Sequence, residues 1–278
     1  MGLKQTAMAK RRMILGLRPG PLGEGAARAE DAGLDFVLLG GRGEPEPAPI
    51  GQDGLTVAAF LMNTTRRIGL AAAVSTAWAP FNVARALASF DHLSAGRGSW
   101  LPWPAPGGDE GARFAEHLDV VMQLFDSWDD DALILDQASG VFADRDRVRR
   151  IRHSGVYYAV DGPLNAPRPP QGRPVLFQPI EAAGPWTDVA LVDLDHLGAC
   201  SSSPAPLVLA EVTGDGANLE RLTGAFARGD CDGFLFSAVD LDGLFGEIVA
   251  RLPITAAPDG DFRARLSLAR PWNRFAAP

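Results

Sequence analysis

The sequence predicts an α/β protein built on a parallel β-sheet with helical connections. Short apolar runs that suit buried strands alternate with segments of helical periodicity in the first part of the chain, and this order is typical of parallel sheets. The chain has 278 residues, of which 46% are hydrophobic, so it can bury one large core. We therefore expect a single domain over residues 1–278.

The elements expected before residue 104 are strands and helices in strict alternation. The strands are 12–17, 35–41, 67–76 and 97–103, and the helices are 24–34, 55–65 and 80–96. Gly33 supplies a left-handed stop for the first helix, and Pro80 suits the first turn of the third. Units of this kind form either an open doubly wound sheet or a closed barrel. Because no Gly-x-Gly-x-x-Gly follows the first strand, a dinucleotide site is not favoured.

The second half of the sequence is less regular. A long helix is expected over 111–136, with its acidic end Asp129–Asp131 in solvent. Residues 148–162 suggest a hairpin, the basic run 145–152 is interpreted as solvated, and prolines make 163–174 a stiff extended arm. Further strands are expected at 175–180, 196–199, 207–212 and 231–239, and further helices at 217–229 and 241–252. The eight strands leave too little chain between the sixth and seventh for a helix, so at least one crossover helix is missing.

Charge and hydropathy argue against two classes of partner. The formal net charge is −8, whereas nucleic-acid binding needs a basic face. No run of eighteen apolar residues occurs and the N-terminus lacks the apolar core of a secretion signal, so we expect no membrane association and a cytoplasmic location. The four histidines and two cysteines are not spaced as metal ligands, and we expect no metal site.

The segment Asp-His-Leu-Ser-Ala-Gly-Arg (91–97) ends the helix predicted over 80–96. The side chains of Asp91, His92 and Ser94 can bond to the last backbone groups of that helix, and Gly96 can turn the chain into the next strand. We therefore interpret this segment as structural rather than catalytic.

Several segments, in this order along the chain, carry a resemblance to a known family. They are AARAEDAGLDFVLLG (26–40), the stretch 63–97 that ends in SFDHLSAGR, the stretch 124–178 that contains GPLNAPRPPQGRPVLFQ, and GDCDGFLF (229–236). Together they resemble the bacterial-luciferase-like superfamily. The most similar branch holds the FMN-dependent monooxygenases that act on nitrilotriacetate, on dibenzothiophene sulfone and in pristinamycin maturation.

The resemblance implies a TIM-like (β/α)8 barrel that uses reduced FMN, supplied by a separate flavin reductase, together with dioxygen. It also implies a homodimer or a heterodimer with a homologue, while the long helical insertion of full-length relatives is missing here. It assigns no catalytic residue. The residues that stand at the family's cofactor-binding positions are Ser75, Thr76, Trp100, Arg113, Gln178 and Gly184.

Other family positions near the flavin carry different residues in this sequence. Leu101 stands where the family has Asn, Ala73 where it has Thr, and Gly41 where it has Asp. Ala182 replaces the phosphate-binding Ser, beside the added carboxylate of Glu181, and the His and Tyr that open the family's fourth helix are gone. If each of five losses removes about 1 kcal/mol and the terms add, FMN binding weakens by roughly three orders of magnitude.

Two hypotheses follow from this pattern. In the first, the chain is a shortened monooxygenase in which Trp78, Trp100 and Trp103 stack on the flavin and Arg97 or Arg113 binds its phosphate. In the second, it is a non-catalytic barrel that pairs with an active homologue or binds another small ligand. The same tryptophans then fill the space that the flavin has left.

Overall fold

The computed structural model describes residues 11–20, 23–40, 53–103, 110–213, 218–237 and 240–276. Gly41, which stands at the family's Asp position, lies outside the described residues. None of the helices in these ranges is long and apolar enough to cross a membrane.

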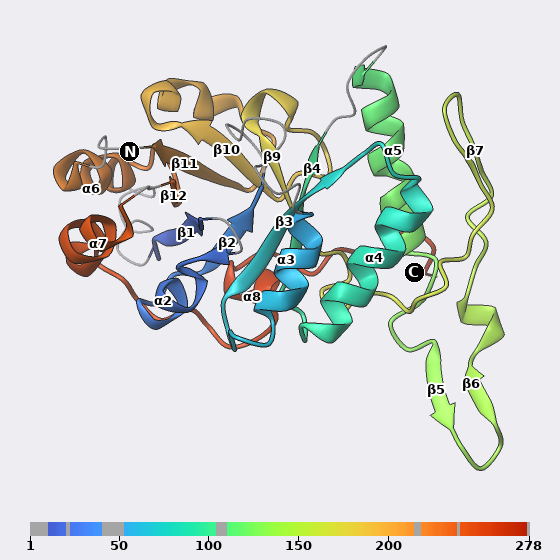
Figure 1. The fold of residues 1–278 in the computed structure, drawn as a ribbon. Coiled ribbons are helices and arrows are strands. Elements are labelled where there is room, and N and C mark those ends of the chain that lie inside the picture. The colour runs from blue at the N-terminus through green and yellow to red at the C-terminus, as the bar shows by residue number, and fades with distance from the viewer. Residues whose placement is uncertain are drawn as a thin grey trace, which may run out of the picture. The chain divides into compact units, whose positions relative to one another are not determined.

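Eight strands form a closed parallel barrel in chain order, which confirms the predicted TIM-like (β/α)8 architecture (Figure 1). The strands are β1 (Ile14–Arg18), β2 (Phe36–Leu39), β3 (Gly69–Ser75), β4 (Gly98–Trp103), β9 (Val175–Pro179), β10 (Val189–Asp193), β11 (Leu207–Thr213) and β12 (Gly233–Ser237). The barrel closes where β1 pairs in parallel with β12, with Ile14 opposite Gly233. Most of these strand residues are buried, as expected where helices cover a parallel sheet.

Helices follow the strands for most of the barrel. They are α2 (Ala26–Asp31), α3 (Gly54–Leu61), α4 (Pro80–Leu93), α5 (Glu110–Phe125), α6 (Leu219–Arg228), α7 (Leu241–Gly243) and α8 (Phe262–Arg265). A π-helical turn (Leu244–Ile248) and a 3-10 turn (Val249–Arg251) continue α7. Pro80 is the first residue of α4, as predicted, because its missing N–H has no partner in a first turn.

The strand predicted over 196–199 is wrong. The sixth barrel strand is β10, and residues Leu194–Ser202 form a 3-10 segment instead. Leu197 of this segment and Ile180 of the 3-10 turn Ile180–Ala182 pack against buried residues of β10 and β11. Short 3-10 segments therefore cover these two strands, and the prediction that a crossover helix is missing is confirmed for this part of the chain.

The helix predicted over 111–136 is too long, because α5 ends at Phe125. The Ser127 hydroxyl donates to the Leu124 carbonyl at 2.7 Å and satisfies one of the last helical acceptors. Beyond this point β5 (Leu133–Asp136) pairs with β6 (Val141–Ala143) as an antiparallel hairpin. A second short hairpin pairs β7 (His153–Ser154) with β8 (Ala159–Val160), which confirms the one predicted over 148–162.

The chain divides into two compact units. The first unit comprises residues 1–73 and 176–259, and the second comprises residues 74–175 and 260–278. In the first unit the rings of Phe36 and Phe177 lie 5.0 Å apart between centroids and fill the core. In the second unit α4 packs along α5. The two hairpins and then the proline-rich arm (163–174) connect α5 to β9 along the chain. A single domain over 1–278 stays a prediction.

Candidate functional site

The six residues at cofactor-binding positions are divided between the two units. Gln178 and Gly184 belong to the first unit, and the other four belong to the second.

Gln178 and Gly184 are joined through Thr187. The Thr187 hydroxyl donates to Gln178 Oε1 at 2.6 Å, and the Gly184 N–H donates to the Thr187 oxygen at 2.8 Å. Gln178 Nε2 donates to the Ala182 carbonyl at 3.0 Å. Gln178 and Thr187 are buried. The groups at the family's phosphate-binding position are therefore used within the loop itself.

An ion pair that the sequence analysis missed lies near the carboxyl ends of strands in the first unit. Arg18, the last residue of β1, donates to Glu211 of β11 at 2.6 Å and to the Gly40 carbonyl at 2.5 Å. Both charged side chains are largely buried. Glu211 interrupts the apolar run of its strand, which was the available signal. Active sites of α/β barrels lie at this end of the strands, so the pair occupies part of that region.

Thr76 and Ser75 end β3 in the second unit. The Thr76 N–H and hydroxyl both donate to the Trp103 carbonyl, at 2.8 and 2.9 Å. The Ser75 hydroxyl accepts from the Ala77 N–H at 3.2 Å. Thr76 thus fastens the end of β3 to the end of β4, and Ser75 shapes the turn that follows.

Trp100 is fully buried in the second unit, as is Leu101 beside it. The indole N–H of Trp100 has no hydrogen-bond partner among the described residues. Trp78 and Trp103, in contrast, are exposed. The three tryptophans therefore do not form one group: Trp100 packs inside the protein, while the other two present ring surface to solvent.

Arg113, near the start of α5, is held by an aromatic residue of the β7–β8 hairpin. Its Nε donates to the Tyr158 hydroxyl at 3.1 Å, and the guanidinium lies 5.8 Å from that ring's centroid. The hydrogen bond from Arg113 to Tyr158 raises the pKa of Arg113 above the ordinary value for arginine. His117, one turn along, meets the Tyr158 ring edge-on at 5.6 Å. Sequence reasoning did not connect Tyr158 with Arg113, because they are distant in the chain.

His117 is buried, and neither ring nitrogen has a partner among the described residues. Burial, with a smaller contribution from the Arg113 charge, lowers its pKa to about 4. His117 is therefore a neutral imidazole at pH 7.

Glu116 organises the turn between β7 and β8. Its carboxylate accepts hydrogen bonds from His153 Nε2 at 3.1 Å and from the backbone N–H groups of Val156, Tyr157 and Tyr158 at 2.9–3.2 Å. Desolvation opposes ionisation, but these hydrogen bonds outweigh it and lower the pKa of Glu116. A carboxylate on α5 therefore fixes the tip of the second hairpin.

The acidic run 129–131 does not form a solvated helix end, so that prediction is wrong. Arg149 binds Asp129 through two bonds, at 2.5 and 2.6 Å, and Arg147 pairs with Asp131. Two members of the basic run 145–152 thus neutralise two members of the acidic run. The solvated interpretation of the basic run holds for Arg145, Arg147 and Arg150, which are exposed, whereas Arg149 is half-buried against Asp129.

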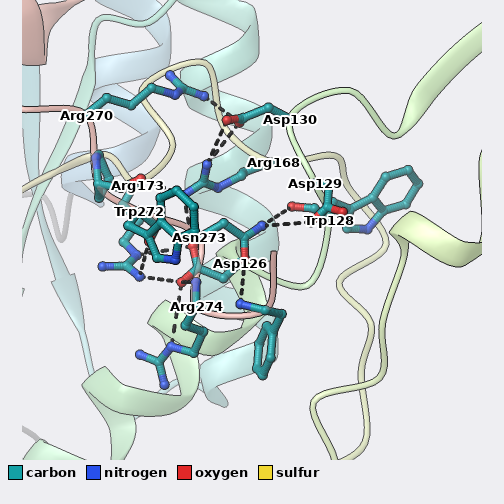
Figure 2. Close-up of polar contacts among 12 residues, drawn as sticks. Asp126, Trp128, Asp129, Asp130, Arg168, Arg173, Arg270, Trp272, Asn273 and Arg274 are labelled. Carbon is teal, nitrogen blue, oxygen red and sulfur yellow. Dashed lines mark hydrogen bonds and ion pairs between the residues drawn. The ribbon is translucent and has the colours of Figure 1, made fainter. Parts of the chain in front are cut away.

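Asp126 is the centre of a larger cluster of ion pairs (Figure 2). Its buried carboxylate accepts from Arg168 at 3.1 Å and from Arg173, and Arg274 Nε lies 3.6 Å away. Asp130 accepts from Arg168 at 3.0 Å and from Arg270 at 2.6 Å. The cluster ties the end of α5 to the proline-rich arm and to the segment after α8.

The segment 91–97 is structural, as predicted. The buried Asp91 carboxylate accepts from the N–H of Gly98 at 3.1 Å, from the N–H of Gln171 at 3.3 Å and from Gln171 Nε2 at 2.6 Å. Burial raises the pKa of Asp91 to about 7. Gly96 has φ +77 and its N–H donates to the Asp91 carbonyl at 2.8 Å, so it makes the left-handed turn into β4. The Ser94 hydroxyl donates to the same carbonyl at 3.3 Å, whereas His92 Nε2 lies 3.4 Å from the Pro167 carbonyl, so the proposed cap by His92 is not formed.

No group of three or more metal-ligating side chains occurs among the described residues. Four sets of polar side chains bond to groups within the protein, in the Gln178 loop, the Arg18–Glu211 pair, the Glu116 turn and the Asp126 cluster.

Known proteins share both the sequence pattern and the fold. The family model for luciferase-like monooxygenases matches residues 8–186. The chain is 36% identical to the B component of pristinamycin IIA synthase from Streptomyces pristinaespiralis over 260 residues, which is 89% of this chain and 88% of that protein. It is 39% identical to dibenzothiophene-sulfone monooxygenase of Rhodococcus erythropolis over 158 residues, 51% of this chain but only 34% of that enzyme.

Solved structures with the same fold include EDTA monooxygenase from Chelativorans sp. BNC1. Its TM-score is 0.72 at 19% identity, covering 94% of this chain and 99% of that one. DmoA from Hyphomicrobium sulfonivorans gives a TM-score of 0.72 at 18% identity, covering 92% of each chain. From the family match and the near-full-length similarity to the synthase component, the chain belongs to the luciferase-like monooxygenase family.

Proposed function

We propose that this chain is one of two proteins that form a luciferase-like, FMN-dependent monooxygenase. This chain does not bind the flavin itself, and it works beside a homologous protein that does. The observation that carries the proposal is the Gln178–Thr187–Gly184 chain of hydrogen bonds, because it uses up the donors at the family's phosphate position. An FMN phosphate would have to displace these bonds and lie near the Glu181 carboxylate, and like charges repel.

Two relatives support a role as one of a pair. The chain aligns along nearly its whole length with the B component of pristinamycin IIA synthase. The A component of the same synthase is 34% identical over 103 residues, 32% of this chain and 20% of that protein. One synthase thus contains two proteins that resemble this chain. The match to the B component extends over a far larger share of its length.

The buried groups of the first unit agree with this proposal. The Arg18–Glu211 pair satisfies two charges near the carboxyl ends of the strands, where active sites of α/β barrels lie. Removing either partner would leave a buried charge, so the pair resists rearrangement around a ligand.

A location in the cytoplasm stays a prediction.

A second candidate function is a shortened monooxygenase that holds FMN through substitute residues and depends on a flavin reductase. The exposed rings of Trp78 and Trp103 favour it, because an exposed indole can stack on an isoalloxazine ring.

Titration with oxidised FMN, and anaerobically with reduced FMN, separates the two candidates. The quenching of flavin and tryptophan fluorescence is the readout. We expect no saturable binding below about 1 mM, because lost contacts worth roughly 5 kcal/mol weaken binding by about three orders of magnitude. Saturation at micromolar FMN would contradict the proposal and favour the shortened monooxygenase.

A double variant tests which residues are responsible. Glu181→Gln with Ala182→Ser removes the carboxylate and restores the family's hydroxyl, so we expect FMN affinity to rise by about tenfold to a hundredfold. Glu220→Gln, which removes a carboxylate from the first turn of α6, is the matched control and should leave FMN affinity unchanged.

A further inference from the structure

His153 of β7 lies between two polar side chains of α5, within the second unit. Its Nε2 lies 3.1 Å from Glu116 Oε1, and its Nδ1 lies 3.1 Å from Gln123 Nε2. The ring has no other hydrogen-bond partner among the described residues. Gln123 Nε2 also donates to Asp119 Oδ2 at 2.7 Å. Gln123 thus joins a histidine of the hairpin to a carboxylate of α5.

These contacts fix which nitrogen of His153 carries the hydrogen. The amide of Gln123 presents its nitrogen to Asp119, because the carboxylate would repel its oxygen. The same nitrogen faces Nδ1 of His153 and can only donate, so Nδ1 carries no hydrogen and accepts. The hydrogen is therefore on Nε2, which donates it to Glu116. This arrangement belongs to the neutral form of His153.

The arrangement cannot accept a proton at Nδ1 without a change. An N–H of His153 would then face the NH2 group of Gln123, and two donors form no bond. If the Gln123 amide turns by half a rotation, its oxygen accepts from Nδ1 instead. The amide nitrogen then no longer donates to Asp119, and the amide oxygen repels that carboxylate. Protonation of the ring therefore releases Asp119 from Gln123.

Asp119 has a second partner on the segment 270–276. Arg274 donates to Asp119 Oδ1 at 3.1 Å, while Gln123 occupies Oδ2. Arginine and carboxylate frequently pair through two parallel hydrogen bonds, which need both carboxylate oxygens. Once Gln123 has turned, Oδ2 of Asp119 is open to the guanidinium. A released Asp119 therefore binds Arg274 more strongly.

The charged groups around His153 come from two elements. Helix α5 contributes the carboxylates of Glu116 and Asp119, and the segment 270–276 contributes Arg274, which bonds to Asp119. Desolvation opposes ionisation of Glu116, but its hydrogen bonds from His153 and the backbone outweigh it and lower its pKa. Glu116 is therefore a carboxylate at about pH 5 and above. A protonated His153 keeps this partner, and its hydrogen bond becomes one between two ions.

We propose that Gln123 is a two-position switch that is set by the protonation of His153. While the ring is neutral, Asp119 is shared between Gln123 and Arg274. When the ring is protonated, Gln123 bonds to His153 through its oxygen, and Asp119 binds Arg274 alone. Mild acid thus fastens the segment 270–276 more tightly to α5, while Glu116 continues to hold the β7–β8 hairpin.

NMR spectroscopy between about pH 5 and pH 8, the range in which most protein histidines titrate, tests the proposal. The side-chain NH2 signals of Gln123 should shift along the titration curve of the His153 ring. The backbone amides of residues 274–276 should exchange about threefold to tenfold more slowly at pH 5 than at pH 8, after correction for the intrinsic effect of pH on exchange. This factor corresponds to one added hydrogen bond.

The variant Gln123→Met removes the switch and keeps a good helix former of similar length. The slower exchange of residues 274–276 at pH 5 should disappear in this variant. Gln137→Met, the same substitution at an exposed position, is the matched control and should keep the wild-type ratio. Gln123 signals that do not follow the His153 titration in the wild type would overturn the proposal. So would a ratio that Gln123→Met leaves unchanged. Neither result bears on FMN binding, which the proposed function concerns.

Discussion

His117 shows what a single buried ionisable group does to stability. Its folded-state pKa is about 4, whereas an unfolded chain has a value near 6.5. Below pH 6.5 the unfolded chain therefore binds a proton that the folded protein cannot, and stability falls as the pH drops towards 4. The loss reaches about 2 kcal/mol at pH 5.

The variant His117→Phe should remove this loss. A phenyl ring keeps the edge-on contact with Tyr158 and leaves no unpartnered nitrogen, so the variant should also be more stable at pH 7.5 by about 1 kcal/mol. Urea unfolding at pH 5 and pH 7.5 measures both effects. His92→Phe, at an exposed position, should keep the wild-type difference between the two pH values. A His117→Phe variant that loses as much stability at pH 5 as the wild type would contradict the assigned pKa.

Asp91 acts in the opposite direction. Burial raises its pKa to about 7, from 3.8 for an ordinary aspartate. The stability contributed by the protonated folded form is fully present below pH 3.8 and is lost as the pH rises through 7. Between about pH 4 and pH 7 the two contributions to stability change in opposite directions and largely offset each other.

At the scale of elements, the hairpin of β7 and β8 depends on close contact with α5. Gly155 lies so near the Glu116 carboxylate that an added Cβ would be 2.1 Å from Oε1. The carboxylate cannot yield without losing its hydrogen bonds to His153 and to the backbone of 156–158. A glycine here is needed for close approach rather than for a special backbone conformation.

Gly155→Ala should therefore destabilise the hairpin by about 1–3 kcal/mol, since it displaces the acceptor of several hydrogen bonds. Hydrogen exchange of the amides of residues 156–158 should speed up, and exchange in β1 and β2 should not. Gly111→Ala, where an added Cβ meets nothing within 4 Å, is the control and should stabilise α5 by up to about 1 kcal/mol. Unchanged exchange at 156–158 would show that Glu116 does not hold the turn.

At the scale of the whole molecule, the Asp126 cluster joins segments that are far apart in the sequence. Asp126→Ala removes an acceptor from the buried Arg168 and from the half-buried Arg173, so the free energy of unfolding should fall by about 3–5 kcal/mol. Asp131→Ala breaks an exposed pair with Arg147 and should cost less than about 1 kcal/mol. Thermal unfolding of the two variants gives the comparison, and similar losses would refute a central role for Asp126.

Much of the fold could be predicted, because alternating apolar runs and helical periodicity are local properties. All the barrel strands except β10 coincide with predicted ones, and α4 begins at its predicted proline. The strand β10 was missed because Val189–Asp193 is a short run between Asp188 and the apolar residues of the next 3-10 segment. Leu197 there packs against the sheet from outside, which gives a strand-like apolar signal without a strand.

The site was less accessible to sequence reasoning. That Gln178 and Gly184 both bond to Thr187 depends on a loop conformation that the sequence alone does not fix. The acidic run looked solvated because its arginine partners lie between 16 and 140 residues further along the chain. The role of Asp91 was partly foreseen, since a carboxylate before a helix-ending glycine indicates a local structural contact, but its bond to Gln171 was not.

The second unit is completed by residues 260–276, which the ribosome makes only after the whole of 176–259. A nascent chain that has reached residue 259 therefore still lacks Arg270 and Arg274, so Asp130 has only Arg168 as an ion-pair partner and Asp119 does not yet have Arg274. The second unit cannot form all of its ion pairs until these arginines have been synthesised. Folding during synthesis is therefore expected to be completed in the first unit before the second.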